Sequence, residues 1–289
     1  MPNLTMPQVS GSTDVYLILG DPVEQVRAPE SFNRIFALHG IDAVLVPVCV
    51  APRDLEGFVR AAFLATNIKG LWVTIPHKMP MAALMDDCTD LGRLAGAVNA
   101  VRRNADGSLG GALFDGEGFV AGLDHAGIAH SGKRVLVIGA GGAAAAIGAS
   151  LALGPRASSA ISFFDPAAGQ AHAVAARIQQ GSRALVQAVG SSDPQGYDLV
   201  VNASPLGLKV SDPVPCDVAR MEPHAALADI LMKNQPTPVV RAARARGLRA
   251  QAGFEMMIQQ THLYLDFFGF HAAARAVQGD LASVRAALG

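Results

Sequence analysis

A stretch of 20 residues without a charged side chain, residues 135–154, constrains the fold more than any other part of the chain. Its length would suit a membrane span. However, Gly139-Ala-Gly-Gly142 interrupts it directly after an apolar tetrad. A strand over residues 135–138, a glycine turn and a helix over residues 143–153 explain this order better. We therefore expect a strand–turn–helix unit and no membrane-spanning helix.

Strands and helices alternate along both halves of the chain. In the first half we expect strands over residues 15–19, 43–50 and 70–75, with helices over residues 29–38 and 54–66. In the second half we expect further strands over residues 160–164, 183–189, 199–202 and 226–230, a helix over 171–179, and two final helices over 256–268 and 271–288. We expect residues 115–129 to link the halves. Repeated strand–helix–strand units predict parallel sheets with helices on both faces.

Composition excludes several classes of protein. The 289 residues are 51% hydrophobic and 16% charged, which excludes a disordered chain and fits two domains. The net charge of −1 argues against a nucleic-acid partner or an anionic membrane held by bulk charge. The three cysteines lie far apart and the eight histidines show no metal-ligand spacing, so we expect no disulfide framework and no metal. Together with a start that lacks a signal peptide, this predicts a cytoplasmic protein.

The glycine turn after residue 138 is typical of a dinucleotide-binding site. Gly139 suits a tight turn, and Gly141 lets the backbone approach a pyrophosphate without an intervening side chain. Gly142 and Ala143 open a helix whose free N–H groups attract phosphate. Ala140 completes this loop. The alternative is a strand–helix turn that binds no ligand.

Asp165 ends the next predicted strand, where an acidic side chain reads the hydroxyls of the adenosine ribose. A carboxylate there repels a 2′-phosphate, and no Arg or Lys stands in residues 163–170 to hold one. We therefore expect NAD as the preferred cofactor, with NADP as the alternative. A purely structural role as a helix N-cap is compatible with both.

Polar residues follow the third strand and stand in two later loops. They lie in Val73-Thr-Ile-Pro-His-Lys78, in Gly96-Ala-Val-Asn99 and in Phe114-Asp115-Gly116. Ligands of open parallel sheets gather at the carboxyl ends of strands. Taken singly, a Lys after a strand is usually a solvated end and an Asp before Gly is usually a turn.

Together these motifs resemble the shikimate dehydrogenase family. Its VTxPxK, GAVNT and GAGGA motifs are matched at residues 73–78, 96–100 and 139–143. Its N-A-T/S-P-x-G motif is matched at Asn202-Ala-Ser204-Pro-Leu-Gly207, and its late G-x-x-M-L-x-x-Q motif at residues 253–260. The resemblance implies an α/β fold of two domains with a cleft between them. A substrate domain with a parallel-rich sheet takes residues 1–117 plus 254–289, and a Rossmann-type nucleotide domain takes residues 118–253.

The resemblance also implies roles for individual residues. Lys78 and Asp115 are expected to form the proton-transfer pair of a reversible hydride transfer between a ring alcohol and a nicotinamide. Thr74, Asn99 and Gln260 are expected to bind the ring hydroxyls. In addition to the glycine loop and Asp165, the residues Asn202, Ser204 and Gly253 are expected to contribute to the cofactor site. His77 is a rival acid–base, although the family pattern makes its position variable.

The sequence departs from the family where the substrate carboxylate is bound. The family's two serines align with Val26 and Ala28, so both hydroxyls are absent. Arg27 lies between them and is a candidate carboxylate anchor. At four other positions near the substrate the family has a polar residue and this chain has an apolar one, namely Ala100, Leu113, Phe114 and Met232.

We therefore expect a shikimate- or quinate-type dehydrogenase, of a family linked to aromatic amino acid biosynthesis, with an altered substrate. One alternative is a non-catalytic NAD-binding regulator on the same scaffold, and another is a dehydrogenase of a different two-domain α/β family. The expected partner is a small cyclic alcohol, with no nucleic acid and no membrane. Either a monomer or a homodimer is consistent with the sequence.

Overall fold

The computed structural model describes residues 9–209 and 211–288 of the chain. The start of the chain, on which the expectation of no signal peptide depends, lies outside these residues. The chain packs as two compact units. The first comprises Met1–Cys88, Val98–Ala112 and Thr261–Gly289, and the second Thr89–Ala97 and Leu113–Gln260. Each unit contains one sheet with helices, which confirms the predicted α/β class.

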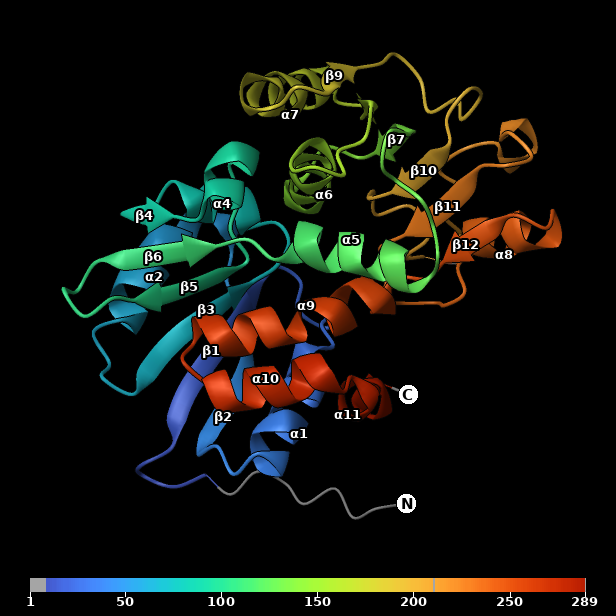
Figure 1. Ribbon diagram of the computed structural model, residues 1–289. Helices are drawn as coiled ribbons and strands as arrows, with labels where there is room; N and C mark the ends of the chain where they lie inside the picture. The colour runs from blue at the N-terminus through green and yellow to red at the C-terminus, as the bar shows by residue number, and fades with distance from the viewer. Residues whose placement is uncertain (1–8, 210, 289) are drawn as a thin grey trace. The chain divides into compact units, whose positions relative to one another are not determined.

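The sheet of the first unit is six-stranded and mixed, in the order β2-β1-β3-β5-β6-β4 (Figure 1). Its strands are β1 (Asp14–Gly20), β2 (Ala43–Cys49), β3 (Ile68–Val73), β4 (Asp87–Cys88), β5 (Ala100–Arg103) and β6 (Leu109–Ala112). The three strands β2, β1 and β3 are parallel, as the sequence predicts. Strand β5 pairs antiparallel with β3, and β6 pairs antiparallel with β5; this hairpin was not predicted from the sequence.

Alternation of side chains along β1 and β3 gives this sheet two different cores. On one face Leu17, Leu19, Leu71 and Val73 pack against the helix that follows β2. On the other face aromatic rings gather around Trp72, which stacks on Tyr264 at 5.2 Å between ring centroids and on Phe268 at 4.3 Å. Other rings of this aromatic cluster are Tyr16, Phe32, Phe36 and Phe270. Offset and edge-to-face ring pairs of this kind stabilise a core beyond the area that they bury.

The sheet of the second unit is parallel throughout, in the order β12-β11-β10-β7-β8-β9. Its strands are β7 (Arg134–Ile138), β8 (Ala160–Phe164), β9 (Leu185–Ala188), β10 (Leu199–Asn202), β11 (Ala226–Asp229) and β12 (Arg249–Gln251). Numbered within this unit, the order is 6-5-4-1-2-3, which is the Rossmann order. The strand order reverses between β7 and β10, and ligands of such sheets bind at the carboxyl ends on either side of that point.

The helices differ from the sequence-based expectation at several points. The helices are α1 (Ala28–Leu38), α2 (Leu55–Ala62), α3 (Lys78–Ala82), α4 (Asp90–Ala95), α5 (Asp115–His125), α6 (Gly142–Ala152), α7 (Ala168–Gly181), α8 (Pro238–Ala245), α9 (Phe254–Phe267), α10 (His271–Gly279) and α11 (Ala282–Leu288), with 3-10 turns η1 (Pro52–Asp54) and η2 (Val218–Arg220). The predicted linker from residue 115 is the helix α5, because Leu123 and Phe119 are buried at helical spacing. The last predicted helix breaks at Asp280, which is extended, and the helices α3, α4 and α8 were not predicted.

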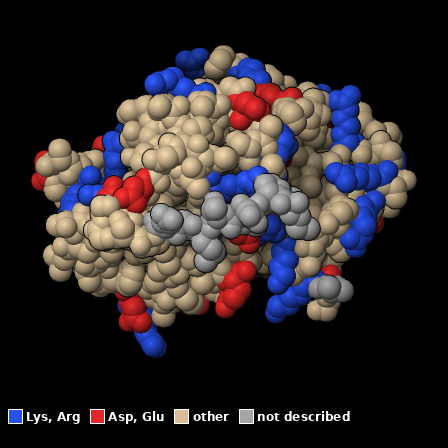
Figure 2. Space-filling view, turned by 90° about the horizontal axis from the view of Figure 1, so that it is seen from below, with Lys and Arg blue, Asp and Glu red and all other residues tan. Residues whose placement is uncertain are grey.

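The uncharged stretch from residue 135 is β7, the glycine turn and α6, as expected. Within the described part of the chain, no helix has both the length and the hydropathy to cross a bilayer. Figure 2 shows one face on which charged side chains of both signs are scattered and most of the surface is uncharged.

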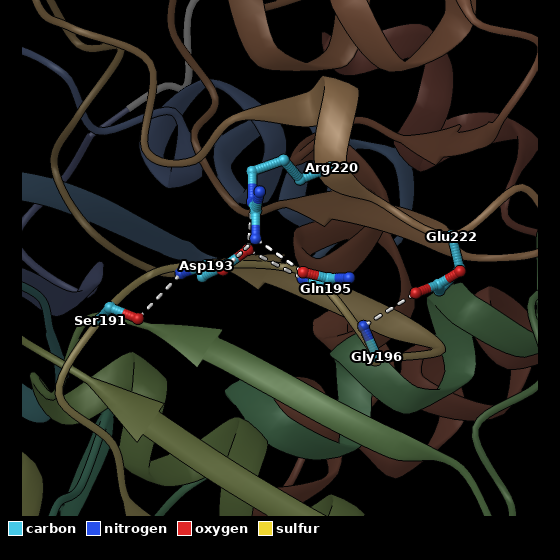
Figure 3. A network of polar contacts seen from close by, with 6 residues as sticks. All are labelled: Ser191, Asp193, Gln195, Gly196, Arg220 and Glu222. Atoms are coloured by element: carbon cyan, nitrogen blue, oxygen red, sulfur yellow. Dashed lines mark hydrogen bonds and ion pairs between the residues drawn. The ribbon is translucent and has the colours of Figure 1, made fainter.

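A polar network ties together the amino ends of β10 and β11 (Figure 3). The Arg220 guanidinium donates to both carboxylate oxygens of Asp193, at 2.9 and 2.7 Å, and to Gln195 Oε1 at 2.6 Å. The Gly196 N–H donates to Glu222 Oε1 at 3.1 Å. The Arg220 guanidinium lowers the pKa of Asp193. Because this network lies at the end of the sheet away from the ligand-binding edge, we interpret it as structural.

At one edge of each sheet, a side-chain amide forms hydrogen bonds with backbone N–H and C=O groups of the edge strand or of the residues just before it. The Asn33 amide donates to Leu45 O at 3.0 Å and accepts from Leu45 N at 2.7 Å on β2. Beside β9, the Gln179 amide donates to Ser182 O and Ala184 O, and its Oε1 accepts from Val186 N at 2.8 Å. Such pairing blocks strand addition at an exposed edge.

Replacing Gln179 by Ala should therefore destabilise the second unit. Three hydrogen bonds disappear and the Val186 N–H loses its acceptor, so we expect a loss of roughly 1–3 kcal/mol in the free energy of unfolding. Urea unfolding followed by circular dichroism measures this. Gln180→Ala is the matched control, since the neighbouring Gln180 is exposed. Equal stability of the two variants would contradict the role of Gln179.

Candidate functional site

The loop after β3 places Thr74 and Lys78 at the carboxyl edge of the first sheet. The Thr74 N–H donates to Leu19 O at 2.9 Å, and the His77 N–H donates to Thr74 O at 2.9 Å. The side chain of Thr74 fills the space in which a Cβ on Gly20 would lie. Lys78 then opens the short helix α3 and is half-buried. The loop is thus fixed to β1 before it reaches Lys78.

His77 anchors the same loop to a second strand. Its ring is fully buried, at 0% exposure, and Nε2 donates to the Val50 carbonyl oxygen at 2.7 Å, just beyond β2. A ring held in this way fixes the loop and is shielded from solvent. Of the two adjacent candidates for proton transfer, the geometry therefore favours Lys78 over His77.

Asn99 lies beside this loop in the first unit. Its N–H donates to Ala112 O at 2.9 Å, and its carbonyl accepts from Val73 N at 2.8 Å and from the Tyr264 hydroxyl at 3.2 Å. The preceding residue, Val98, donates its N–H to the Lys78 carbonyl at 2.9 Å. The structure therefore brings three predicted substrate-site residues, Thr74, Lys78 and Asn99, to one edge of one sheet.

Arg27 caps the start of α1 in the loop after β1. Its Nε donates to Glu30 Oε2 at 2.8 Å. Ala28, one of the two positions at which the family has a serine, is buried, and Val26 is half-buried. The guanidinium of the residue between these two apolar side chains is thus paired with a carboxylate.

In the second unit, Asp115 and Gln260 lie on packed helices. Asp115 is the first residue of α5 and is 3% exposed. One turn later, a Cβ on Gly118 would come within 2.7 Å of the Gln260 Cβ, so α5 and α9 touch there without an intervening side chain. Residues three apart share one face of a helix. Asp115 therefore lies one helical turn before the point where α5 contacts Gln260.

The glycine loop after β7 packs directly on the loop after β10. Gly139 has φ of 109°, a conformation that favours glycine, and a Cβ there would lie 2.6 Å from the Ala203 carbonyl oxygen. By contrast, a Cβ on Gly141 would meet no atom within 4 Å. Gly141 is the N-cap residue of α6 and has no side chain that could cap the first N–H groups of this helix. An open approach to free helix N–H groups fits a phosphate group.

Asp165 connects this loop to the start of α7. One carboxylate oxygen accepts from the Ala140 N–H at 2.9 Å, and the other accepts from the Ala167 N–H at 2.8 Å. The N-cap residue of α7 is Ala167, so Asp165 itself is not the N-cap. The carboxylate still places a negative charge beside the glycine loop, at the carboxyl end of β8.

Asn202 and Ser204 shape the loop after β10. Asn202 Oδ1 accepts from the Ser204 hydroxyl at 2.6 Å and from its N–H at 3.2 Å. Gly253 lies against the loop after β11, because a Cβ there would overlap the Leu231 carbonyl. Asn202, Ser204 and Gly253 thus fix the backbone of the carboxyl edge.

A buried carboxylate at this edge was not among the predicted site residues. Asp229 ends β11 at 2% exposure, and its oxygens accept from Thr237 Oγ1 at 2.5 Å, Leu231 N at 3.0 Å and Asn202 Nδ2 at 3.3 Å. Burial raises the pKa of Asp229, and these donors partly offset that effect. The one feature of the sequence that could have pointed to Asp229 is its place at the end of an apolar strand. Its partners lie too far apart in sequence to be read from a motif.

A Rossmann sheet with an open glycine loop, together with a lysine and an amide at the edge of a second sheet, defines a two-domain nicotinamide-dependent dehydrogenase. Comparison with known proteins names the family. The model of the shikimate dehydrogenase substrate binding domain matches residues 18–101. The shikimate dehydrogenase (NADP(+)) of Rubrobacter xylanophilus is 36% identical over 266 residues, which cover 89% of this chain and 91% of the relative. The chain belongs to the shikimate dehydrogenase family.

Two solved structures are similar along almost the whole chain. One is shikimate 5-dehydrogenase from Listeria monocytogenes in complex with shikimate and NAD, with a TM-score of 0.80, 25% identity, and coverage of 95% of this chain and 98% of that chain. The other is the ligand-free form of 5-ketofructose reductase of Gluconobacter, with a TM-score of 0.79, 25% identity, and coverage of 94% and 100%. Proteins with this fold are therefore named for at least two different substrates, shikimate and 5-ketofructose.

Removing the Thr237 hydroxyl should destabilise the carboxyl edge in a pH-dependent way. In Thr237→Val the buried carboxylate of Asp229 loses a donor, so its folded-state pKa rises further above the unfolded value. We expect a loss of about 1–3 kcal/mol in the free energy of unfolding at pH 8. This loss should shrink as the pH falls through the folded-state pKa, because a protonated carboxyl no longer needs that donor.

Urea unfolding at a series of pH values measures this effect, with Thr66→Val as the control, since Thr66 is exposed. A loss that stays constant from pH 8 to acid pH would show that Asp229 is not the group involved.

Proposed function

We propose that this chain interconverts a neutral ring alcohol and its ketone by hydride transfer, with Lys78 and Asp115 as the proton-transfer residues and NAD as the preferred cofactor. Membership of the family supports the reaction class. The single observation that supports the altered substrate is the Arg27–Glu30 ion pair next to Val26 and Ala28. Two hydroxyls of the family are absent there, and the charge of the neighbouring guanidinium is paired.

A carboxylate placed against these side chains would lose hydrogen bonds that it has in water, which is costly. A neutral substrate does not incur this cost. The structural neighbour from Gluconobacter is named for 5-ketofructose, a ketose without a carboxylate. The curated relative from Rubrobacter is named for shikimate, so shikimate is the competing substrate.

The proposed chemistry of the chain is proton transfer at the substrate oxygen. When bound, the nicotinamide supplies or accepts the hydride. In reduction, Lys78 donates a proton to the carbonyl oxygen as that oxygen gains negative charge. In oxidation, the pair takes the hydroxyl proton as the hydride leaves. Thr74, Asn99 and Gln260 orient the ring by bonding its other hydroxyls.

The cofactor preference is supported by Asp165 and its surroundings. Its carboxylate lies at the carboxyl end of β8, and the next residues, Pro166 and Ala167, carry no charge. A negative charge that is followed by no cation in the next residues of the chain disfavours a 2′-phosphate. The preference for NAD would distinguish this chain from its Rubrobacter relative, whose name specifies NADP(+).

Gly141→Val tests the cofactor loop without disturbing the fold. Because a side chain at Gly141 meets open space and its φ is −79°, we expect a melting temperature close to that of the wild type. We expect NAD binding to weaken at least about tenfold, since the side chain fills the approach to the helix N–H groups. Calorimetric titration of NAD and NADP measures both the loss and the wild-type preference.

Gly57→Val is the matched control, because a Cβ on Gly57 also meets open space, on α2. Unchanged NAD affinity in Gly141→Val would contradict the assignment of the loop. Tighter binding of NADP than of NAD by the wild type would contradict the role of Asp165.

A substrate panel tests the reaction itself. Nicotinamide absorbance would be followed with shikimate, quinate, 5-ketofructose and neutral cyclic alcohols. We expect turnover of a neutral compound, a loss of about 100-fold or more in kcat for Lys78→Met and Asp115→Asn, and little change for Lys69→Met. Lys69 is a suitable control because it is an exposed lysine on β3, whose ammonium group donates to Thr66 O at 3.0 Å and lies 3.5 Å from an Asp14 carboxylate oxygen.

The double variant V26S/A28S should gain activity on shikimate by about tenfold or more, because each restored hydroxyl can bond a charged carboxylate. Wild-type turnover of shikimate at a rate normal for the family would overturn the altered specificity. Cofactor binding with no turnover of any compound would favour the alternative, a non-catalytic regulator.

A further inference from the structure

Arg177 holds a turn at the end of α4. It lies on α7, and its Nη1 donates to the Ala95 carbonyl at 3.0 Å. The guanidinium covers the Cα of Gly96 so closely that a Cβ there would overlap it. Gly96 has φ of 63° and is the C-cap residue of α4. A carbonyl at the end of a helix is one that the helix itself leaves unpaired, so Arg177 supplies the missing donor.

The backbone that leaves this turn carries the proposed substrate site. Ala97, Val98 and Asn99 follow Gly96 and are all fully buried. The Val98 N–H donates to the Lys78 carbonyl, and the Asn99 carbonyl accepts from Val73 N. The turn is thus followed at once by Val98, which bonds the Lys78 backbone, and by Asn99.

We propose that Arg177 is a positioning residue that holds the turn at residues 95–97 in register with the Lys78 and Asn99 backbone. This inference rests on the proposed function, because it takes Lys78 and Asn99 as the residues that act on the substrate. Arg177 belongs to α7, which follows Asp165 in the chain, so an element next to the cofactor loop also holds the turn before the substrate residues. Small displacements of groups that act on a substrate reduce kcat strongly.

Arg177→Met tests the proposal, because Met keeps the length of the side chain and removes the donors. We expect kcat for the substrate found in the panel to fall about tenfold and the Kd for NAD to stay within twofold. The exposed Arg183 gives the matched control, Arg183→Met, in the same unit. In Arg177→Ala, added guanidinium ion should restore part of kcat by refilling the site above Gly96, whereas added urea should not.

A second readout does not depend on activity. Amide hydrogen exchange should become faster in peptides that contain Val98 and Asn99 in Arg177→Met, and it should stay unchanged in peptides from β10 and β11. Faster exchange together with a fall in kcat, in a variant that circular dichroism shows to be folded, supports the proposal.

Unchanged exchange at residues 96–100 would overturn the proposal, and so would equal kinetics of the two Arg→Met variants. If the wild type turns over no compound of the panel, the proposed function fails. In that case the exchange measurement still decides whether Arg177 holds the turn.

Discussion

The carboxyl edge of the second sheet depends on one close approach between two loops. The Cα of Gly139 lies against the Ala203 carbonyl with no room for a side chain, and the Ala203 N–H donates to Ile138 O at 2.8 Å. This contact joins the ends of β7 and β10, at the point where the strand order reverses. Asp165 bonds the glycine loop from one side and Asn202 fixes the other loop. The loops around the open space beside Gly141 are therefore held by contacts within the protein.

In the first unit, the loop at the carboxyl edge of the sheet is also held in place, but through different contacts. Its functional loop contains no glycine, and it is fixed by hydrogen bonds to three segments, at Leu19, Val50 and Val98. Behind these segments the sheet has a buried face of aliphatic side chains and a buried face of stacked rings around Trp72. A loop bonded to strands that are packed on both faces has little freedom to move. Lys78 is thus carried by a rigid support, although its own side chain is long.

The parts of the fold that could be predicted are those encoded by neighbouring residues. The glycine turn, the strand before it and the helix after it follow from a continuous stretch, and each is where the sequence placed it. The hairpin of β5 and β6 has strands of four residues, and Arg102 and Arg103 are exposed, so neither length nor alternation identified it. Helix α5 begins with Asp115-Gly-Glu-Gly118, and its glycines resemble a loop. They are required because Gly116 and Gly118 pack directly on α6 and α9. A requirement that arises from tertiary packing cannot be read from local propensity.

The same distinction applies to the site. Thr74, Lys78 and Asn99 were predicted from motifs, and the structure brings them together within one unit, whereas Asp229 bonds Asn202 and Arg177 bonds Ala95, both distant in sequence. Asn99, Asp115 and Gln260 share a further property, since each lies within three residues of a point where the chain leaves one compact unit for the other. At Asn99 the consequence is visible. Its own backbone groups bond strands of the first unit, while Gly96, three residues earlier, packs under a guanidinium of the second. A residue fixed from both directions along the chain has little conformational freedom left to lose, and under the proposed function this reduces the entropy cost of holding a substrate in a reactive orientation.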